Sequence, residues 1–215
     1  MPESLTNVLT FAVLGFMGVR LASGLRVSMR RSGRSLTREI VTGIRWRHVW
    51  PIVVVFPTVI AAATVLMSVP GLQWGWWSMI GGEGTPVFGS SSTTVGTVWE
   101  WLVPLAFITM LVPALPLFAH AEERIFRAGA EGWSPGRKVW KVLQFGMAHA
   151  LIGIPLGAAL ALSVGGAYFM AVYLRAWSIT HQRREATMES ARAHTAYNAV
   201  IVALVMFLTL WIALA

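Results

Sequence analysis

The chain has 215 residues, of which 56% are hydrophobic and 12% are charged, and it contains neither aspartate nor cysteine. A soluble domain carries about twice that charged fraction, so the composition excludes an ordinary soluble protein and a disordered one. The lack of cysteine excludes disulfides, thiolate nucleophiles and cysteine-ligated metal sites. The net charge of +8 does not indicate a nucleic-acid partner, because basic residues in a membrane protein mark the loops that face the cytoplasm.

Apolar stretches long enough to cross the roughly 30 Å hydrocarbon core of a bilayer recur along the chain. We predict an all-α fold, a polytopic integral membrane bundle of about six transmembrane helices embedded in the lipid bilayer. The predicted spans are 5–25, 49–69, 99–121, two antiparallel helices within 142–174, and 193–214. The stretch 142–174 is divided because its 33 uncharged residues exceed one straight crossing and are interrupted by Gly153 and Pro155.

Charged residues predict which ends of the spans face the cytoplasm. The segment 26–47 contains seven arginines, whereas 70–97 contains no lysine or arginine but has Trp74, Trp76 and Trp77, which suit a membrane interface. The arginine-rich segment fits both an amphipathic helix on the membrane surface and a solvated connector. We therefore expect a multi-pass protein of a bacterial plasma membrane with both termini outside. The cytoplasmic loops are then 26–48, 122–141 and 175–192.

Ionisable residues beside or inside the predicted spans form three clusters, and such residues are costly in hydrocarbon unless they are paired or functional. In chain order the clusters are Glu122 and Glu123 with Arg127, Phe145 with His149, and His194 with Asn198. Taken singly, each has a structural explanation, as an interface anchor, a packing histidine or an interhelical polar contact. Together they all fall in the predicted cytoplasmic half of the membrane, where they can converge.

In this order, the patterns E-E-x-x-x-R, F-x-x-x-H and H-x-x-x-N resemble the motifs of the CPBP family of intramembrane proteases. That family includes the type II CAAX prenyl endopeptidases and bacteriocin-processing and self-immunity homologues. The resemblance covers the second half of the chain. It implies that the whole chain consists of a CPBP-like core at 98–215 and two additional N-terminal helices, with their basic and tryptophan-rich loops, at 1–97. It implies an intramembrane endopeptidase that cleaves a membrane-associated protein or peptide, with its active site facing the cytoplasm.

The resemblance also implies roles for the motif residues. Glu122 would remove a proton from the attacking water, and His149 would help to orient that water. Arg127 would hold the acidic pair in place, while His194 and Asn198 would donate hydrogen bonds to the oxyanion of the tetrahedral intermediate. This mechanism needs no cofactor.

Two alternatives remain at this point. Glu122, His149 and His194 also make up a two-histidine, one-carboxylate set that suits Zn²⁺ with a water at the open position. Asn198 favours the metal-free mechanism, because an amide is a poor zinc ligand but a good oxyanion donor. The other alternative is a non-catalytic CPBP-like accessory or scaffold subunit of a larger membrane complex, favoured by many small residues suited to helix packing. Transport is less favoured, because no inverted repeat is visible.

Overall fold

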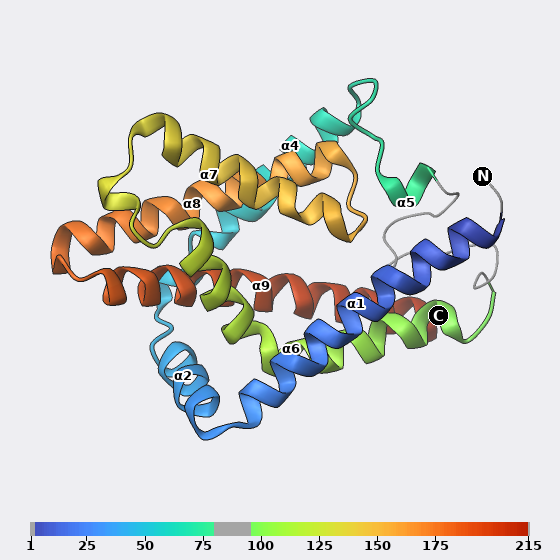
Figure 1. The fold of residues 1–215 in the computed structure, drawn as a ribbon, viewed down its shortest axis with the longest axis horizontal. Coiled ribbons are helices and arrows are strands. Elements are labelled where there is room, and N and C mark those ends of the chain that lie inside the picture. The colour runs from blue at the N-terminus through green and yellow to red at the C-terminus, as the bar shows by residue number, and fades with distance from the viewer. Residues whose placement is uncertain (1–2, 80–95, 215) are drawn as a thin grey trace.

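The computed structural model describes residues 3–79 and 96–214, and these residues form helices and turns with no strand (Figure 1). The helices are α1 (Glu3–Met29), α2 (Arg31–Thr42), α3 (Trp46–Val49), α4 (Ile52–Met67), α5 (Trp76–Met79), α6 (Trp99–Phe126), α7 (Pro135–Ala148), α8 (Leu156–Thr180) and α9 (Arg183–Leu214). Two 3₁₀ turns, η1 (Ala130–Gly132) and η2 (His149–Ile152), flank α7. The prediction of an all-α fold is confirmed.

Five segments of the described residues are long and apolar enough to cross a membrane, which supports a multi-pass membrane protein. They are Phe11–Met29, Trp46–Met67, Trp99–Gly132, Leu156–Thr180 and Arg183–Leu208. The remaining predicted span corresponds to α7, which has 14 residues and packs along α8. Of the six predicted spans, five thus correspond to candidate membrane-crossing segments among the described residues, and the sixth corresponds to the shorter helix α7.

The helices pack so that both halves of the chain contribute to one bundle. Helix α8 contacts α4, α7 and α9, while α6 contacts both α9 and α1. The turns on either side of η1 and between α8 and α9 lie at one end of the molecule together with α2 (Figure 1). Helix α5 lies at the other end, as do the beginning of α1 and the end of α9. This arrangement gathers the predicted cytoplasmic loops at one end.

The break between α7 and α8 lies where the sequence predicts it. After η2, Gly153 has a φ of 93°, a left-handed conformation that glycine adopts without a Cβ clash. Pro155 then precedes the first residue of α8, where its fixed φ and missing N–H are tolerated. At the other end of α7, Ser134 accepts a hydrogen bond from the Arg137 backbone N–H at 3.3 Å, as expected of an N-cap.

Helix α6 is longer than the predicted span 99–121, because it continues without interruption to Phe126. Glu122 and Glu123 therefore lie inside a helix and not in a loop that follows it. Consecutive helical residues point about 100° apart, so these two neighbours face different surroundings. Helical geometry also places Arg127 four residues after Glu123, on the same side of α6.

Helix α9 begins at Arg183, whereas the sequence predicts a span starting at residue 193. The charged residues of the added part are held by ion pairs to other elements. Arg183 lies 2.7 Å from Glu131 of η1, and Arg184 lies 2.6 Å from Glu39 of α2. These contacts allow a charged segment to form the first turns of a packed helix.

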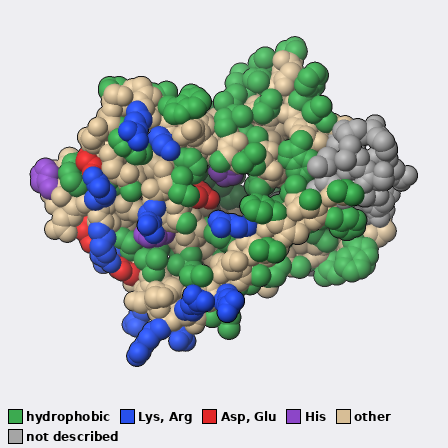
Figure 2. Space-filling model, viewed as in Figure 1, with side chains coloured by type: hydrophobic (Ala, Val, Ile, Leu, Met, Phe, Trp, Pro, Cys, Tyr) green, Lys and Arg blue, Asp and Glu red, His purple; other side chains and the backbone are tan. Residues whose placement is uncertain are grey.

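The arginine-rich segment is helical. Helix α2 buries Gly33 and Ile40 and exposes Arg31, Arg34 and Arg38, the pattern of an amphipathic helix. Figure 2 shows that basic side chains gather over the half of the molecule that contains α2 and the α8–α9 turn, while much of the other half of this face is apolar.

The tryptophan-rich segment packs against the beginning of α8 over the part that the structure describes. The backbone carbonyls of Leu72 and Trp74 accept hydrogen bonds from the N–H groups of Gly157 at 2.6 Å and Leu156 at 2.9 Å. These bonds satisfy two of the four free N–H groups at the start of α8. The predicted interface tryptophans are described, whereas residues 80–95 of the predicted loop lie outside the described residues.

Candidate functional site

The charged motif residues of α6 and α9 meet in a buried cluster inside the bundle. Glu123 and Arg127 are fully buried, and only 2% of His194 is exposed. The Glu123 Oε1 atom lies 2.9 Å from Arg127 Nη1 and 2.8 Å from His194 Nδ1. Because an ionised carboxylate only accepts hydrogen bonds, both nitrogens donate to Glu123. The first and third sequence motifs are thus joined directly, although 71 positions separate Glu123 from His194.

Ser190 completes the surroundings of Glu123, and the motif analysis did not identify it. Its hydroxyl donates to Glu123 Oε2 and also lies 2.9 Å from the Phe169 carbonyl oxygen. Ser190 is fully buried. It precedes His194 by four residues on α9, so the two side chains share one helix face. That spacing is the sequence signal that could have identified it.

The Arg127 guanidinium is held by aromatic rings as well as by Glu123. Its Cζ lies 4.1 Å from the centroid of the Phe145 ring and 5.4 Å from that of Phe169. Its Nη2 donates to the Gly166 carbonyl oxygen at 3.4 Å. Cation–π contacts of this kind strengthen when water is excluded, as it is here. Phe145, the first residue of the second motif, therefore belongs to the cluster.

Glu122 lies at the edge of the cluster with 36% of its side chain exposed. Its Oε2 atom is 3.7 Å from His194 Nε2, which is too long for a direct hydrogen bond but within reach of a bridging water. The two ring nitrogens of His194 thus face the two adjacent glutamates. Glu123 is buried and accepts three side-chain hydrogen bonds, whereas Glu122 is accessible.

His149 is joined to the cluster through Phe145. Its Nδ1 lies 2.9 Å from the Phe145 carbonyl oxygen, so this nitrogen donates and Nε2 is left as an acceptor. The Phe145 ring contacts both histidine rings, with centroid distances of 5.2 Å to His149 and 5.5 Å to His194. The second motif is therefore adjacent to the third, with an aromatic ring between the two histidines.

Asn198 follows His194 by one helical turn on α9 and is partly buried. Within the described residues its side-chain amide has no hydrogen-bond partner. The surface drawn in Figure 2 is hollowed near its centre, where an acidic and a histidine side chain are visible.

The alternative zinc set does not fit this arrangement. Among the described residues, no group of three histidine, aspartate or glutamate side chains is placed to hold a metal ion. His194 directs Nδ1 to Glu123, and His149 is turned toward the carbonyl of its own helix with the Phe145 ring beside it. Glu122, His149 and His194 are therefore not assembled as zinc ligands.

Comparisons of the chain with protein-family models, with curated proteins and with solved structures found no match. The site consists of a buried Glu123–Arg127 pair, His194 between Glu122 and Glu123, and His149 beside the ring of Phe145, which also contacts His194.

Proposed function

We propose that this chain is an intramembrane endopeptidase that cleaves a membrane-associated protein or peptide, with Glu122 as the general base. The supporting observation is the position of His194 between two glutamates, 2.8 Å from Glu123 and 3.7 Å from Glu122. A water between Glu122 and His194 Nε2 is within reach of both groups. The resemblance to CPBP proteases likewise assigns the general base to Glu122 and an oxyanion donor to His194.

Glu123 and Arg127 act as positioning residues in this mechanism. Glu123 is buried and accepts hydrogen bonds from three side chains, so it has no free lone pair directed at a substrate. It fixes the orientation of the His194 ring, as buried carboxylates do for catalytic histidines. Arg127 compensates the charge of Glu123, which would otherwise be a buried carboxylate without a countercharge.

The proposed reaction is the hydrolysis of a peptide bond. Glu122 takes a proton from the water, and the resulting hydroxide forms a bond to the carbonyl carbon of the substrate. His194 Nε2 and the Asn198 amide donate to the oxyanion. The C–N bond then breaks, and protonated Glu122 transfers its proton to the departing amine. His149 orients the water through its free Nε2, which accepts a hydrogen bond.

His194 donates from Nε2 only as an imidazolium, because Nδ1 already donates to Glu123. In that form the ring and the Arg127 guanidinium carry two positive charges, which balance the two carboxylates. A balanced cluster is the least costly state for ionised groups inside a membrane protein. By the positive-inside rule, the site then lies in the cytoplasmic half of a bacterial plasma membrane, near the end that contains α2.

The experiment that tests this proposal compares Glu122→Gln with Glu39→Gln. Glu39 is a glutamate of α2 whose side chain is 37% exposed, close to the 36% of Glu122, so it serves as the matched control. Each protein is reconstituted in liposomes with detergent-extracted membrane proteins, and newly formed peptide termini are labelled and identified. The native protein and Glu39→Gln should produce the same new termini. Glu122→Gln should lower their rate of formation by about 10² to 10⁴, because the base is lost.

His194→Ala should cause a comparable loss, on the order of 10² to 10³, through the oxyanion. New termini that persist in both variants at the native rate would exclude the peptidase and favour the accessory-subunit alternative. The sequence argument for that alternative is weakened by the fold, because its small residues are turned inward. Gly157, Ala161, Gly165 and Gly166 of α8 are all buried within the chain.

A further inference from the structure

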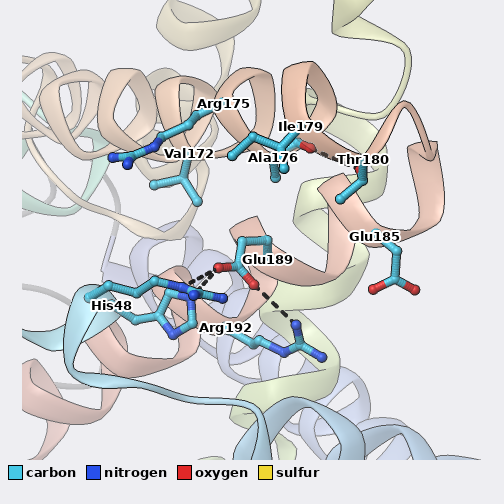
Figure 3. A pocket seen from close by; sticks show the side chains of 10 residues that line it. His48, Val172, Arg175, Ala176, Ile179, Thr180, Glu185, Glu189 and Arg192 are labelled. Carbon is cyan, nitrogen blue, oxygen red and sulfur yellow. Dashed lines mark hydrogen bonds and ion pairs between the residues drawn. The ribbon is translucent and has the colours of Figure 1, made fainter.

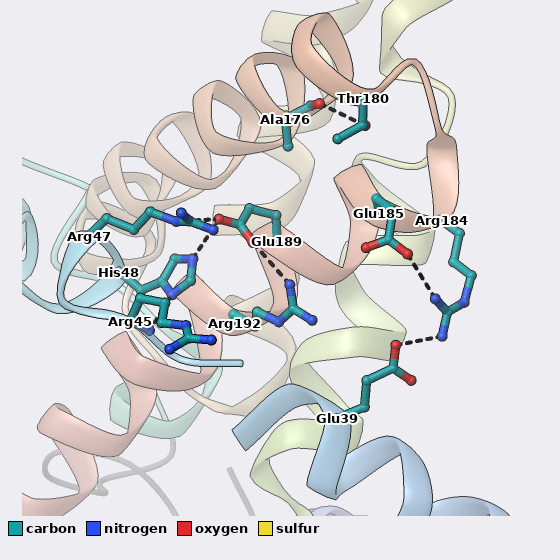
Figure 4. Close-up of polar contacts among 10 residues, drawn as sticks. All are labelled: Glu39, Arg45, Arg47, His48, Ala176, Thr180, Arg184, Glu185, Glu189 and Arg192. Atoms are coloured by element: carbon teal, nitrogen blue, oxygen red, sulfur yellow. Dashed lines mark hydrogen bonds and ion pairs between the residues drawn. The ribbon is translucent and has the colours of Figure 1, made fainter. Parts of the chain in front are cut away.

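A second polar cluster surrounds Glu189 of α9 (Figure 4). Glu189 and Ser190 are consecutive residues of one helix, so their side chains point about 100° apart. Glu189 Oε1 accepts hydrogen bonds from Arg47 Nε at 2.7 Å and His48 Nε2 at 2.8 Å. Its Oε2 accepts from Arg192 Nη1 at 3.1 Å. One carboxylate thus receives three nitrogen donors, two of them on guanidinium groups.

His48 is neutral in this arrangement, which leaves the cluster with excess positive charge. Its Nδ1 accepts a hydrogen bond from the Arg45 backbone N–H at 2.9 Å, so the ring proton is on Nε2, the nitrogen that donates to Glu189. His48 is only 2% exposed and contributes no charge. Two guanidinium groups therefore face a single carboxylate, and the cluster carries one uncompensated positive charge.

The cluster forms one wall of a groove of about 400 Å³, and α8 forms the opposite wall (Figure 3). Arg175 lies on α8 and is exposed, and its side chain has no hydrogen bond or ion pair within the part of the chain that the structure describes. Val172, Ala176 and Ile179 also line this wall, at spacings that place them on one side of α8. Glu185 lies near the rim and is already paired with Arg184 at 2.9 Å.

We propose that this groove binds an anionic phospholipid. Its phosphate would lie between Arg47, Arg175 and Arg192, and an acyl chain would run from there past Val172 along α8, away from the α8–α9 turn. The groove carries surplus positive charge beside apolar side chains, which complements a molecule that is negative at one end and apolar at the other. It also lies where two candidate spans end, near Thr180 and Arg183, at the level of lipid headgroups.

The test measures binding of dioctanoyl phosphatidylglycerol to the detergent-solubilised protein by native mass spectrometry. Arg175→Gln should weaken binding by about 10-fold, because one charge-assisted contact is lost. Since the Arg175 side chain has no partner among residues 3–79 and 96–214, this variant should fold normally. Arg38→Gln, which removes an exposed arginine of α2 on the same surface, should bind as the native protein does.

Two further measurements identify the lipid as the source of the phosphate. Val172→Asn should also weaken phosphatidylglycerol binding, because it removes part of the apolar wall on the bilayer side of Arg175, and dioctanoyl phosphatidylcholine should bind more weakly than phosphatidylglycerol. Equal losses for Arg175→Gln and Arg38→Gln would overturn the proposal in favour of diffuse attraction to the basic surface. Displacement of the lipid by equimolar inorganic phosphate, with binding to Val172→Asn unaffected, would also overturn it. Arg175 is outside the peptidase cluster, so this test is independent of the proposed hydrolysis.

Discussion

Glu122 and Glu123 are chemically identical neighbours with opposite surroundings. The helical rotation between consecutive residues of α6 points Glu123 into the buried interior, toward Arg127, His194 and Ser190. Glu122 stays partly exposed. Because of this difference, the two carboxylates are suited to different chemical roles. A carboxylate saturated by donors cannot easily accept another proton, while an accessible carboxylate beside a histidine can exchange one with water.

Glu123→Gln should destabilise the protein by about 3–5 kcal/mol, because it leaves the Arg127 guanidinium buried without a charged partner. Glu39→Gln should cost less than about 1 kcal/mol, because it removes only a partly exposed ion pair with Arg184. The check is thermal unfolding in detergent, followed by tryptophan fluorescence. If the two variants unfolded at the same temperature, the Glu123–Arg127 pair would not contribute to stability as its burial indicates.

At the residue scale, the sequence predicts the members of the cluster better than their contacts. Glu123, Arg127 and His194 could be identified from the sequence because ionisable groups within apolar stretches are costly unless they are paired or functional. Ser190 could not be selected with the same force, because serine is common in helices and its role depends on a carboxylate 67 residues away. The hydrogen bond between the His149 ring and the Phe145 carbonyl of α7 could not be predicted either, because it depends on local backbone geometry.

At the scale of elements, the close approach of α7 to α8 positions the Arg127 guanidinium. A Cβ built on Gly166 would lie 2.8 Å from Phe145 Cδ1 and 3.4 Å from Arg127 Nη2. A Cβ built on the adjacent Gly165 would meet only Phe169, at 4.0 Å. Two neighbouring glycines of one helix therefore differ sharply in the space around them.

Gly166→Ala should destabilise the protein by about 1–3 kcal/mol, because the added methyl group must displace Phe145 or the guanidinium. Gly165→Ala should be neutral or stabilising by up to about 1 kcal/mol, because alanine favours the helix and meets no obstacle. Unfolding temperatures of the two variants, measured side by side, provide the comparison. A larger loss for Gly165→Ala would show that the packing around α8 is assigned incorrectly.

The sequence predicts helix boundaries well where local chemistry sets them. Ser134 and Pro135 mark the start of α7, and Gly153 and Pro155 separate it from α8, because capping and backbone restrictions act within a few residues. The start of α9 depends on something else. Its first turns are charged, and they pack as helix because distant Glu39 and Glu131 neutralise them, which no local pattern can reveal.

At the scale of the whole molecule, the predicted loops sort to two ends of the bundle. The arginine-rich end contains α2 and the α8–α9 turn, while the tryptophan segment lies at the other end beside the start of α8 (Figure 1). The order of apolar and basic segments along the sequence predicts this alternation, because the length of each span and the position of the arginines determine which loops share a side. The pairing of α8 with α4 as well as α7 does not follow from composition, since it depends on interlocking side chains.

Single cysteines introduced at exposed positions should report the orientation, because the natural chain has no cysteine. Cysteines replacing Ser32 of α2 and Gln182 of the α8–α9 turn should react from the same side of the membrane. A cysteine replacing Gln73 should react from the opposite side. The measurement uses a membrane-impermeant maleimide on intact and opened cells. Labelling of Ser32 and Gln73 sites from one side would exclude the predicted topology.

The pairing of Glu123 and Arg127 within one helix has a consequence for biogenesis. Both residues belong to α6, four positions apart, so their ion pair can form before α8 and α9 are synthesised. Glu123 and Arg127 can therefore enter the bilayer as a mutually neutralised pair, at a lower cost than two separate ions. Ser190 and His194 leave the ribosome more than 60 residues later. They then add hydrogen bonds to a Glu123 whose charge Arg127 of the same helix already balances.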